Sequence, residues 1–509
     1  MFFFDSKILS LSISTAVLSG DYDFSAVPAD VNASLTNVTA QPVTWHLTWN
    51  FSPVPDDTLD NTCVSEGSSS IGCQNQSLGE DIPISGTLFS LHYQSDRQLG
   101  RGGADLVAII DAQGLGGWTL SVHHVLEPLI NKFCIDGSCT PASLQLKALY
   151  LGDGRMRSAA KVQAPVRLNG KVYLASEDGG EIYVFDGSSG RHLQTLRPLS
   201  GAILYDFGYD SAGELVSVTD AHGNLTKIMR DAKEHPTAIV SPYGQTTTLA
   251  LDSNSYLSQL TDPAGKKILL VHSTFGLLTS MTDANGNTSR YRYDSLGRLL
   301  QDTDPAGGST TLSRTDTANG YQVTKATALG STNTYHTTFS SKAGTSSSQQ
   351  FTNISPCGVQ ATSSETQENN QLSESESLPD GSSSTTTIGP DPRWGIQVPV
   401  PTSTTLTSGS LTAKTSHKRT ANLGTTGNPF SLITQTDTDT VNGRVYTSTF
   451  MASNRTYTNT TPVGRQQLVT LDAKERIATT QVGGLLPTQF AYDSRGAWPQ
   501  PRKALAIPA

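Results

Sequence analysis

The sequence has little charge: only 16% of its 509 residues are Asp, Glu, Lys or Arg, against about a quarter in ordinary soluble domains. Its 45 glycines, 25 prolines and Ser/Thr tracts replace the Ala, Glu, Lys and Leu that helices favour, which argues against a helical protein. The net charge of −9 offers no concentrated basic face, so nucleic-acid binding is not expected. Nor does any stretch approach the roughly 20 apolar residues of a transmembrane helix.

The amino end lacks the features of a good signal peptide. The apolar run from Ile8 to Leu18 is interrupted by serines, and Asp5 offsets Lys7 where positive charge is expected. We interpret residues 1–30 as a weak signal-like or disordered segment. The expected location is secreted or associated with the cell envelope, and a cytoplasmic stage before export is the alternative.

Cysteine is scarce, and four of the five cysteines form two close pairs. Cys63 and Cys73 flank a Gly/Ser loop, and Cys134 and Cys139 flank Ile-Asp-Gly-Ser. A disulfide within each pair is expected in an oxidising compartment, and reduced thiols in a reducing one. The spacings do not match those of structural zinc ligands.

Motifs with a known catalytic mechanism are missing. The sequence contains no HExxH, no GxxxxGK[ST], no GxGxxG after a strand and no GxSxG. Asp262, Asp283, Asn285 and Asn287 carry oxygens that suit calcium, but the later bidentate glutamate of a calcium loop is absent. We therefore assign no catalytic, cofactor-binding or metal-binding residues, and we expect a protein that is not an enzyme.

What the chain does contain is a repeat. Residues 209–313 divide into five rows of 21 residues without gaps. Within each row the chain alternates between short β-branched runs, which predict strands, and turns that contain aspartate and glycine. The predicted turn residues are Tyr209, Asp210, Gly213, Asp220, Gly223, Asp262, Gly265, Asp283, Gly286, Tyr293, Asp294, Gly297, Asp304 and Gly307.

Each row therefore predicts strand, turn, strand, turn. Aspartate can accept a hydrogen bond from the backbone two residues on, and glycine takes the positive φ that closes a hairpin. Hairpins of equal length can pair edge to edge. The predicted fold is all-β: repeated hairpins forming one continuous curled sheet, with a β-rich amino-terminal region. A β-propeller is the alternative, since residues 171–196 resemble part of a blade, but blades need roughly 40 residues per unit.

The repeat resembles the tyrosine-aspartate (YD) repeat of the RHS family, whose consensus is close to YDxxGRL followed by DxxGN. The stretches 209–215 and 293–299 match the first half, and 220–224 and 283–287 match the second. The segments 89–97 and 151–155 resemble the stretch that precedes the repeats in this family, and 183–186 and 190–193 resemble its entry strands. The 21-residue spacing returns at Asp472 and Tyr492, so the resemblance spans about residues 85–496.

The resemblance implies a β-sheet shell that encloses a cargo, commonly a toxin, and delivers it between bacterial cells. A toxin cargo or a secretion-system component would then be the partner. The alternative is a surface adhesion module that binds carbohydrate or protein, since the animal relatives, the teneurins, are adhesion receptors. Aromatic faces suit sugar rings, and the candidate tyrosines are Tyr209, Tyr243, Tyr256, Tyr291 and Tyr293.

Two departures from the family pattern stand out. The PxxxxDPxGL junction of toxin-bearing members is absent. Residues Pro390–Gly395 match it in part, and we interpret them as a rigid turn. After Gly496 the chain continues into a tail with three prolines, which predicts a truncated reading frame and an open sheet edge.

The expected segments are 1–30, a β-rich region at 31–160, repeats at 161–316, Ser/Thr-rich degenerate strands or linker at 317–460, and terminal repeats with the tail at 461–509.

Overall fold

The computed structural model describes residues 4–5, 8–15, 43–50, 62–64, 70–73, 76–98, 114–129, 132–135, 138–141, 145–153, 155–158, 165–342, 346–368 and 371–493. Within these ranges every regular element is a strand except one short 3₁₀ turn, η1 (Ser95–Arg97). The all-β prediction is therefore confirmed. The predicted signal-like segment and the proline-rich tail lie largely outside the described residues.

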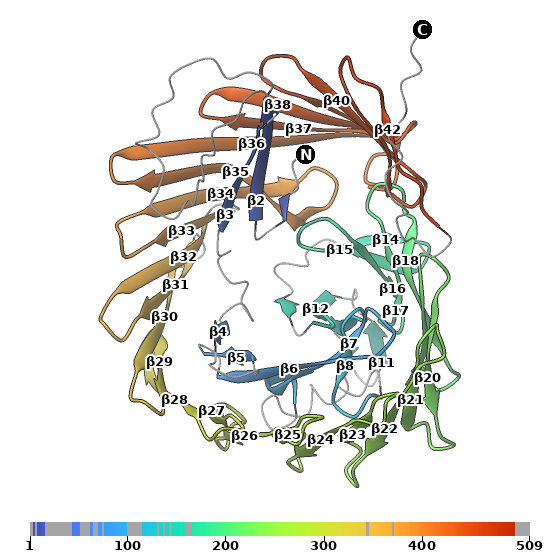
Figure 1. Cartoon of the computed structure of the whole chain (residues 1–509), viewed down its shortest axis with the longest axis vertical. Helices are drawn as coiled ribbons and strands as arrows, with labels where there is room; N and C mark the ends of the chain where they lie inside the picture. The colour runs from blue at the N-terminus through green and yellow to red at the C-terminus, as the bar shows by residue number, and fades with distance from the viewer. Residues whose placement is uncertain are drawn as a thin grey trace.

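One antiparallel sheet of 29 strands, which we call the wall, dominates the molecule (Figure 1). Each strand pairs with the next in chain order, so the continuous-sheet prediction is confirmed and the propeller alternative is wrong. The first half of the wall consists of β14 (Val166–Leu168), β15 (Lys171–Ala175), β16 (Ile182–Asp186), β17 (His192–Leu196), β18 (Ile203–Tyr209), β19 (Leu215–Asp220), β20 (Leu225–Arg230), β21 (Pro236–Val240), β22 (Thr246–Leu251), β23 (Leu257–Thr261), β24 (Lys267–His272), β25 (Leu278–Thr282), β26 (Thr288–Tyr293), β27 (Leu299–Thr303) and β28 (Ser309–Thr317).

The second half of the wall has longer strands that are rich in serine and threonine. Such residues suit a pleated surface that is half exposed. These strands are β29 (Gly320–Thr327), β30 (Thr332–Lys342), β31 (Ser346–Ile354), β32 (Gln360–Glu368), β33 (Gln371–Ser377), β34 (Ser383–Asp391), β35 (Gly395–Ser408), β36 (Leu411–Leu423), β37 (Leu432–Val441), β38 (Arg444–Met451), β39 (Thr456–Thr460), β40 (Gln466–Leu471), β41 (Ile477–Val482) and β42 (Thr488–Gln489).

The concave face of the wall carries one inward side chain per strand in a central column. Because each repeat supplies two strands, column members follow one another at alternating steps of ten and eleven residues. The members from β19 to β29 are Val218, Ile228, Ile239, Leu249, Leu260, Leu270, Met281, Tyr291, Asp302, Leu312 and Val323. Asp302 is the single charged member of this column.

The amino-terminal strands form smaller sheets. A five-stranded sheet contains β4 (Thr62–Val64), β5 (Ser70–Gly72), β6 (Ser77–Pro83), β7 (Ser90–Gln94) and β8 (Thr119–Leu120). The other sheets are built from β9 (Val125–Leu129), β12 (Gln145–Tyr150) and β13 (Met156–Ser158), from β10 (Lys132–Ile135) and β11 (Ser138–Pro141), and from β1 (Phe4–Asp5), β2 (Ile8–Thr15) and β3 (Val43–Asn50).

The segment from β5 to β13, which we call the inner region, lies inside the curve of the wall (Figure 1). Its buried residues, among them Leu78, Tyr93 and Trp118, share a single hydrophobic cluster with wall residues from Phe207 to Tyr335. Burial of apolar surface stabilises by about 25 cal/mol per Å². The two parts of the chain therefore stabilise one another.

The wall also meets itself. Trp394, Val398 and Val400 of the β34–β35 segment pack on Ile182 and Val184 of β16, about 210 residues earlier in the chain. Polar contacts extend this junction, which we call the seam: Glu475 Oε1 accepts the Leu199 N–H at 2.9 Å, and Arg393 Nη2 donates to the Pro198 carbonyl at 2.6 Å. Side chains and loops make the seam, since no ladder joins β14 to β42 among the described residues.

The segment Pro390–Gly395 supplies much of the seam. The Asp391 carboxylate accepts the N–H groups of Arg393 and Trp394 at 2.7 and 2.9 Å, which holds the chain in a turn. That turn directs the Trp394 indole into the cluster with β15 and β16. The partial junction motif is thus a structural element of wall closure in this chain.

Candidate functional site: the docking face between the wall and the inner region

The aspartates of the repeat organise its turns. In the turn after β19, Asp220 Oδ1 accepts the N–H groups of His222 and Asn224 at 2.8 and 2.9 Å, and Gly223 takes a φ of +81°. The same pair of hydrogen bonds recurs at Asp262, Asp283 and Asp304, where Gly265, Gly286 and Gly307 also have positive φ. This arrangement matches a three-residue hairpin loop closed by a glycine bulge.

These turns lie at one edge of the wall. A Cβ added to Gly223, Gly265, Gly286 or Gly307 would meet nothing within 4 Å, whereas the turn at Ser241 on the same edge lies against Gly86 of the inner region.

The turns at Asp210 and Asp294, with Gly213 and Gly297, lie at the other edge. Next to this edge, Leu257, Leu278 and Leu299 contact the inner region.

The tyrosines that precede these aspartates tie successive repeats. Tyr293 Oη donates to the Leu278 carbonyl at 2.9 Å, and Tyr209 Oη donates to the His192 carbonyl at 2.8 Å. Tyr492 makes the equivalent bond to Ile477 at 2.9 Å. In the second repeat Arg230 occupies this position and donates to the Leu215 carbonyl at 3.0 Å. The tie is absent from the third and fourth repeats, where Leu251 and His272 occupy this position.

A bulge follows each of these turns, and in three repeats it directs one backbone N–H at the inner region. Leu257, Leu278 and Leu299, each 21 residues apart, donate to the Gly116 carbonyl at 3.0 Å, to Tyr93 Oη at 2.8 Å and to the Gln76 carbonyl at 2.7 Å. The inner region therefore matches the repeat spacing of the wall. Because buried N–H groups are costly when unpaired, these three bonds fix the register of docking.

Three buried histidines lie where the inner region meets β17. His123 and His124 belong to the loop between β8 and β9, and His192 begins β17. Tyr209 Oη already donates to the His192 carbonyl, so it must accept from His123 Nε2 at 2.7 Å. His124 Nδ1 accepts the Gly152 N–H at 2.9 Å, and His192 Nδ1 accepts the His124 N–H at 3.1 Å. The rings of His124 and His192 are therefore neutral, because an accepting ring nitrogen carries no proton.

Burial sets the protonation state of this cluster. Removal from water lowers the pKa of His123 and of His124 to about 3, and it places the pKa of His192 well below its ordinary value. A proton on His124 Nδ1 would face a backbone donor at hydrogen-bond distance. The cluster is therefore stable only when uncharged.

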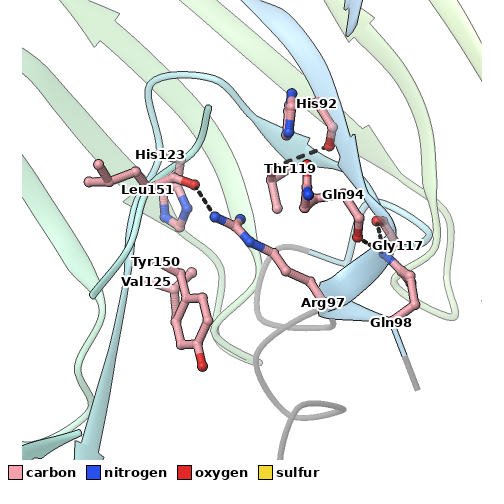
Figure 2. Close-up of a pocket in the computed structure, with 10 residues that line it drawn as sticks. All are labelled: His92, Gln94, Arg97, Gln98, Gly117, Thr119, His123, Val125, Tyr150 and Leu151. Atoms are coloured by element: carbon pink, nitrogen blue, oxygen red, sulfur yellow. Dashed lines mark hydrogen bonds between the residues drawn. The ribbon is translucent and has the colours of Figure 1, made fainter. Parts of the chain in front are cut away.

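A pocket beside this cluster joins the two segments that precede the repeats in the sequence (Figure 2). Arg97, at the end of the first segment, donates through Nη2 to the carbonyls of Leu151 and Arg155, both at 2.8 Å, in the second. Its guanidinium lies 5.4 Å from the centre of the Tyr150 ring. The pocket is lined by His92, Gln94, Arg97, Gln98, Gly117, Thr119, His123, Val125, Tyr150 and Leu151.

The other candidate residues are distributed differently. Cys73 is disulfide-bonded, while the side chains of Cys63, Cys134 and Cys139 lie outside the described residues. Cys134 and Cys139 are paired positions of the β10–β11 hairpin. No group of three or more His, Cys, Asp or Glu residues in the described ranges could hold a metal ion. In those ranges no helix has the length and apolarity needed to cross a membrane.

The candidate tyrosines do not share one surface. Tyr291 is buried and donates to Glu80 Oε1 at 2.6 Å, and Tyr209 and Tyr293 bind backbone carbonyls. Tyr243 is exposed in the turn after Ser241, whereas Tyr256 lies in the turn after Asp252, at the opposite edge of the wall. A stacking platform for sugars is therefore not assembled by these five residues.

Sequence reasoning missed His192, Arg97 and Trp394. The histidines show no ligand spacing, and the segments 89–97 and 151–155 could be recognised as similar to other proteins without any sign that they meet. A buried Arg-carbonyl contact leaves no periodic signal in a sequence.

Comparison with known proteins agrees with the architecture. A protein-family model described as Teneurin YD-shell matches residues 169–503. Teneurin-3 of Danio rerio is 35% identical over 92 residues, which are 18% of this chain and 3% of that protein. Teneurin-4 of Mus musculus is 35% identical over 109 residues, 20% of this chain and 4% of that protein. The matched stretch is thus a small fraction of the length of these relatives.

Solved structures also align. The crystal structure of TcdB2-TccC3-TEV covers 84% of this chain and 29% of its own, with 11% identity and a TM-score of 0.24. The crystal structure of TcdB2-TccC3 covers 84% of this chain and 30% of its own, with 12% identity and a TM-score of 0.23.

Proposed function

The chain belongs to the teneurin YD-shell family, and we propose that it is a non-enzymatic structural protein whose wall encloses other polypeptide. The observation that carries the proposal is the seam. Because the wall meets itself between β16 and the β34–β35 segment, it surrounds its concave face instead of spreading as an open sheet. This geometry suits containment.

The inner region is the first polypeptide that the wall encloses. Its docking through three amides in repeat register leaves it a fixed part of the shell. One face of β36–β39 carries a polar row beside the apolar cluster of Phe450 and Val469: Arg419 pairs with Asp437 at 2.6 Å, and Ser448 Oγ donates to Asn459 Oδ1 at 2.7 Å.

We further propose that the cargo is a toxin segment delivered between bacterial cells, as the resemblance to the RHS family implies. Export is supported by the disulfide at Cys73, because disulfides persist in oxidising compartments. The adhesion alternative is less favoured, since the five tyrosines do not form a shared surface.

Limited proteolysis of the purified chain tests enclosure. Trypsin should cut at exposed wall positions such as Lys266 and Arg465 well before it cuts at Arg97 and Arg157, which are buried in the inner region. A seam variant, Trp394→Ala combined with Glu475→Ala, should expose the inner-region sites sooner. Equal cleavage of both groups in the unaltered chain would contradict containment.

A further inference from the structure

The seam joins the two opposite edges of the wall. Because every strand pairs antiparallel with the next, turns after odd-numbered strands lie along one edge and turns after even-numbered strands along the other. We call these the odd edge and the even edge. At the seam the odd edge contributes the turns after β15, β17 and β19, and the even edge contributes those after β34, β36 and β40. The wall therefore closes by stacking one edge on the other.

Three polar contacts define this stacking. Arg393, in the turn after β34, donates to the Pro198 carbonyl in the turn after β17. Glu475, in the turn after β40, accepts the Leu199 N–H. Its neighbour Lys474 donates through Nζ to the Ala221 carbonyl in the turn after β19. The odd edge thus presents backbone groups, and the even edge reaches them with long side chains.

Leu199 supplies the apolar part of the same contact. It packs against the cluster that contains Leu432 and Phe450 of the last wall strands. Leu199 is the third residue of its turn, counted from Arg197, whose carbonyl accepts the N–H that closes the turn. An apolar side chain at this position of an odd-edge turn is therefore a contact residue where the edge is covered.

Further along the odd edge, three successive turns carry exposed apolar side chains. Leu329, the third residue of the turn after β29, is 93% exposed, and Val359 and Leu378 are exposed in the turns after β31 and β33. Neighbouring turns on one edge are about 10 Å apart, since adjacent strands are spaced by about 4.8 Å. Single exposed apolar residues are ordinary, but a contiguous group of them marks an interaction surface.

The even edge carries a matching pair. Phe275 and Leu296 are the third residues of the adjacent turns after β24 and β26, and they are 60% and 59% exposed. The turns 273–277, 327–331 and 355–359 contain no charged side chain. Bringing them together removes apolar surface from water without burying a charge, so their association is favourable.

We propose that a second copy of this chain docks here, with the even edge of one copy, at Phe275 and Leu296, stacked on the odd edge of the other, at Leu329, Val359 and Leu378. The reason is continuity: these odd-edge turns prolong the edge that the seam covers, and the chain covers that edge with its own even edge. Between copies the contact repeats what the seam makes within one chain.

The two docking surfaces are different, so the contact is heterologous. A pair of copies then keeps one free odd-edge surface and one free even-edge surface. Further copies can add at both ends unless the arrangement closes into a ring. Self-association should therefore continue beyond the dimer as concentration rises.

Sedimentation velocity on the intact chain provides the test, on a Cys357→Ser background that removes the exposed thiol. Leu329→Asp and Phe275→Asp should each raise the dissociation constant about tenfold or more, because docking would bury an unpaired carboxylate. The matched control, Asn285→Asp, adds the same charge at the third position of the odd-edge turn after β25, about 20 Å from the turn of Leu329. It should leave association unchanged.

Mixing the two variants tests the direction of stacking. Leu329→Asp retains an intact even edge, and Phe275→Asp retains an intact odd edge. Each should be monomeric alone, and the mixture should form a 1:1 dimer that grows no further. A mixture that stays monomeric, or single variants that associate like the unaltered chain, would overturn the proposal.

Val359→Asp and Leu296→Asp change the same two surfaces and replace the first pair if either of its members fails to fold. They should weaken association alone and restore a dimer when mixed. An unaltered chain that is monomeric at every soluble concentration would also overturn docking of a second copy, and it would assign the exposed apolar turns to a different protein.

Discussion

Nδ1 of His192 accepts the backbone N–H of His124 at 3.1 Å, and the two rings stack with centroids 5.0 Å apart. This contact crosses from the first strands of the wall to the inner region. It makes the attachment of the two parts sensitive to acid, because a nitrogen that must accept cannot be protonated without losing its bond.

Acid should destabilise the folded chain through this cluster. The pKa of His124 is about 3 in the folded chain, against 6.5 for an ordinary histidine, so the unfolded chain binds protons first. Its contribution is fully present above pH 6.5 and is lost as pH falls from 6.5 towards 3. The loss for His124 is about 3 kcal/mol by pH 4.5.

Denaturant unfolding between pH 7.5 and 4.5 measures this effect. Asparagine can accept the Gly152 N–H but cannot be protonated, so His124→Asn should flatten the pH dependence. The control His235→Gln alters a histidine in an exposed turn and should not. A dependence that is identical in both variants would assign acid sensitivity to other groups.

Removal of the Asp302 charge should stabilise the wall. The carboxyl lies in the apolar column opposite Tyr291, its Oδ1 has no partner among the described groups, and burial raises its pKa to about 6. The folded state therefore prefers the neutral acid, and stability falls as pH rises from about 4 to 6. Above pH 6 the cost is about 2 kcal/mol.

Asp302→Asn and Asp302→Leu should both raise the free energy of unfolding at pH 7 and remove that pH dependence. The control Asp316→Asn, at an exposed position of β28, should have little effect. A loss of stability in Asp302→Asn at pH 7 would show that the charged carboxylate has a favourable role.

Backbone conformation should decide the cost of replacing the turn glycines. Gly286 has a φ of +87° and nothing within 4 Å of an added Cβ, so strain is the only penalty. Gly286→Ala should cost about 1 kcal/mol, and Gly286→Asn less, because asparagine tolerates this conformation. Gly483→Ala is the matched control, since a Cβ there meets only the Gln466 carbonyl at 3.6 Å. Equal losses at both positions, measured by thermal unfolding, would contradict the turn assignment.

Tyr93→Phe should weaken docking of the inner region. The hydroxyl accepts the Leu278 N–H at 2.8 Å and donates to the Gly276 carbonyl at 3.2 Å, both in the wall. Its loss leaves a buried N–H unpaired, which costs about 1 to 3 kcal/mol. Hydrogen exchange of Leu278 should accelerate accordingly. Tyr173→Phe provides the comparison, because the Tyr173 ring packs on Phe430 and its hydroxyl makes no hydrogen bond in the described structure.

The repeat itself could be predicted from sequence because its causes are local. A turn needs an acceptor at Asp220 and a positive φ at Gly223, and both requirements act within five residues. Strand pairing then follows from equal hairpin lengths. Composition was less informative in the second half: the segment 317–460, for which degenerate strands and linker both remained open, includes the paired strand β33.

The docking face and the seam could not be predicted because their partners are remote. Arg157 donates to the Gln397 carbonyl at 2.6 Å across 240 residues, and Glu475 reaches Leu199 across 276. The sequence around each of these residues does not indicate its partner, because the two are brought together only by the curvature of the wall. The register in which the inner region docks on the wall cannot be read from the sequence either, because Gly116 and Gln76 contribute backbone carbonyls and not side chains.

Closure of the wall at the seam is the central claim, and cross-linking tests it most directly. Glu475 Oε1 accepts the N–H groups of Leu199 and Ser200, so cysteines at 200 and 475 should lie within reach of a short bismaleimide. On a Cys357→Ser background, the pair Ser200→Cys and Glu475→Cys should cross-link within one chain and migrate as a compact species on denaturing gels. The pair Ser200→Cys and Arg465→Cys, with the second cysteine in a neighbouring turn, should cross-link far less. Failure of the 200–475 pair to cross-link, or equal yields for both pairs, would contradict a wall that closes on itself.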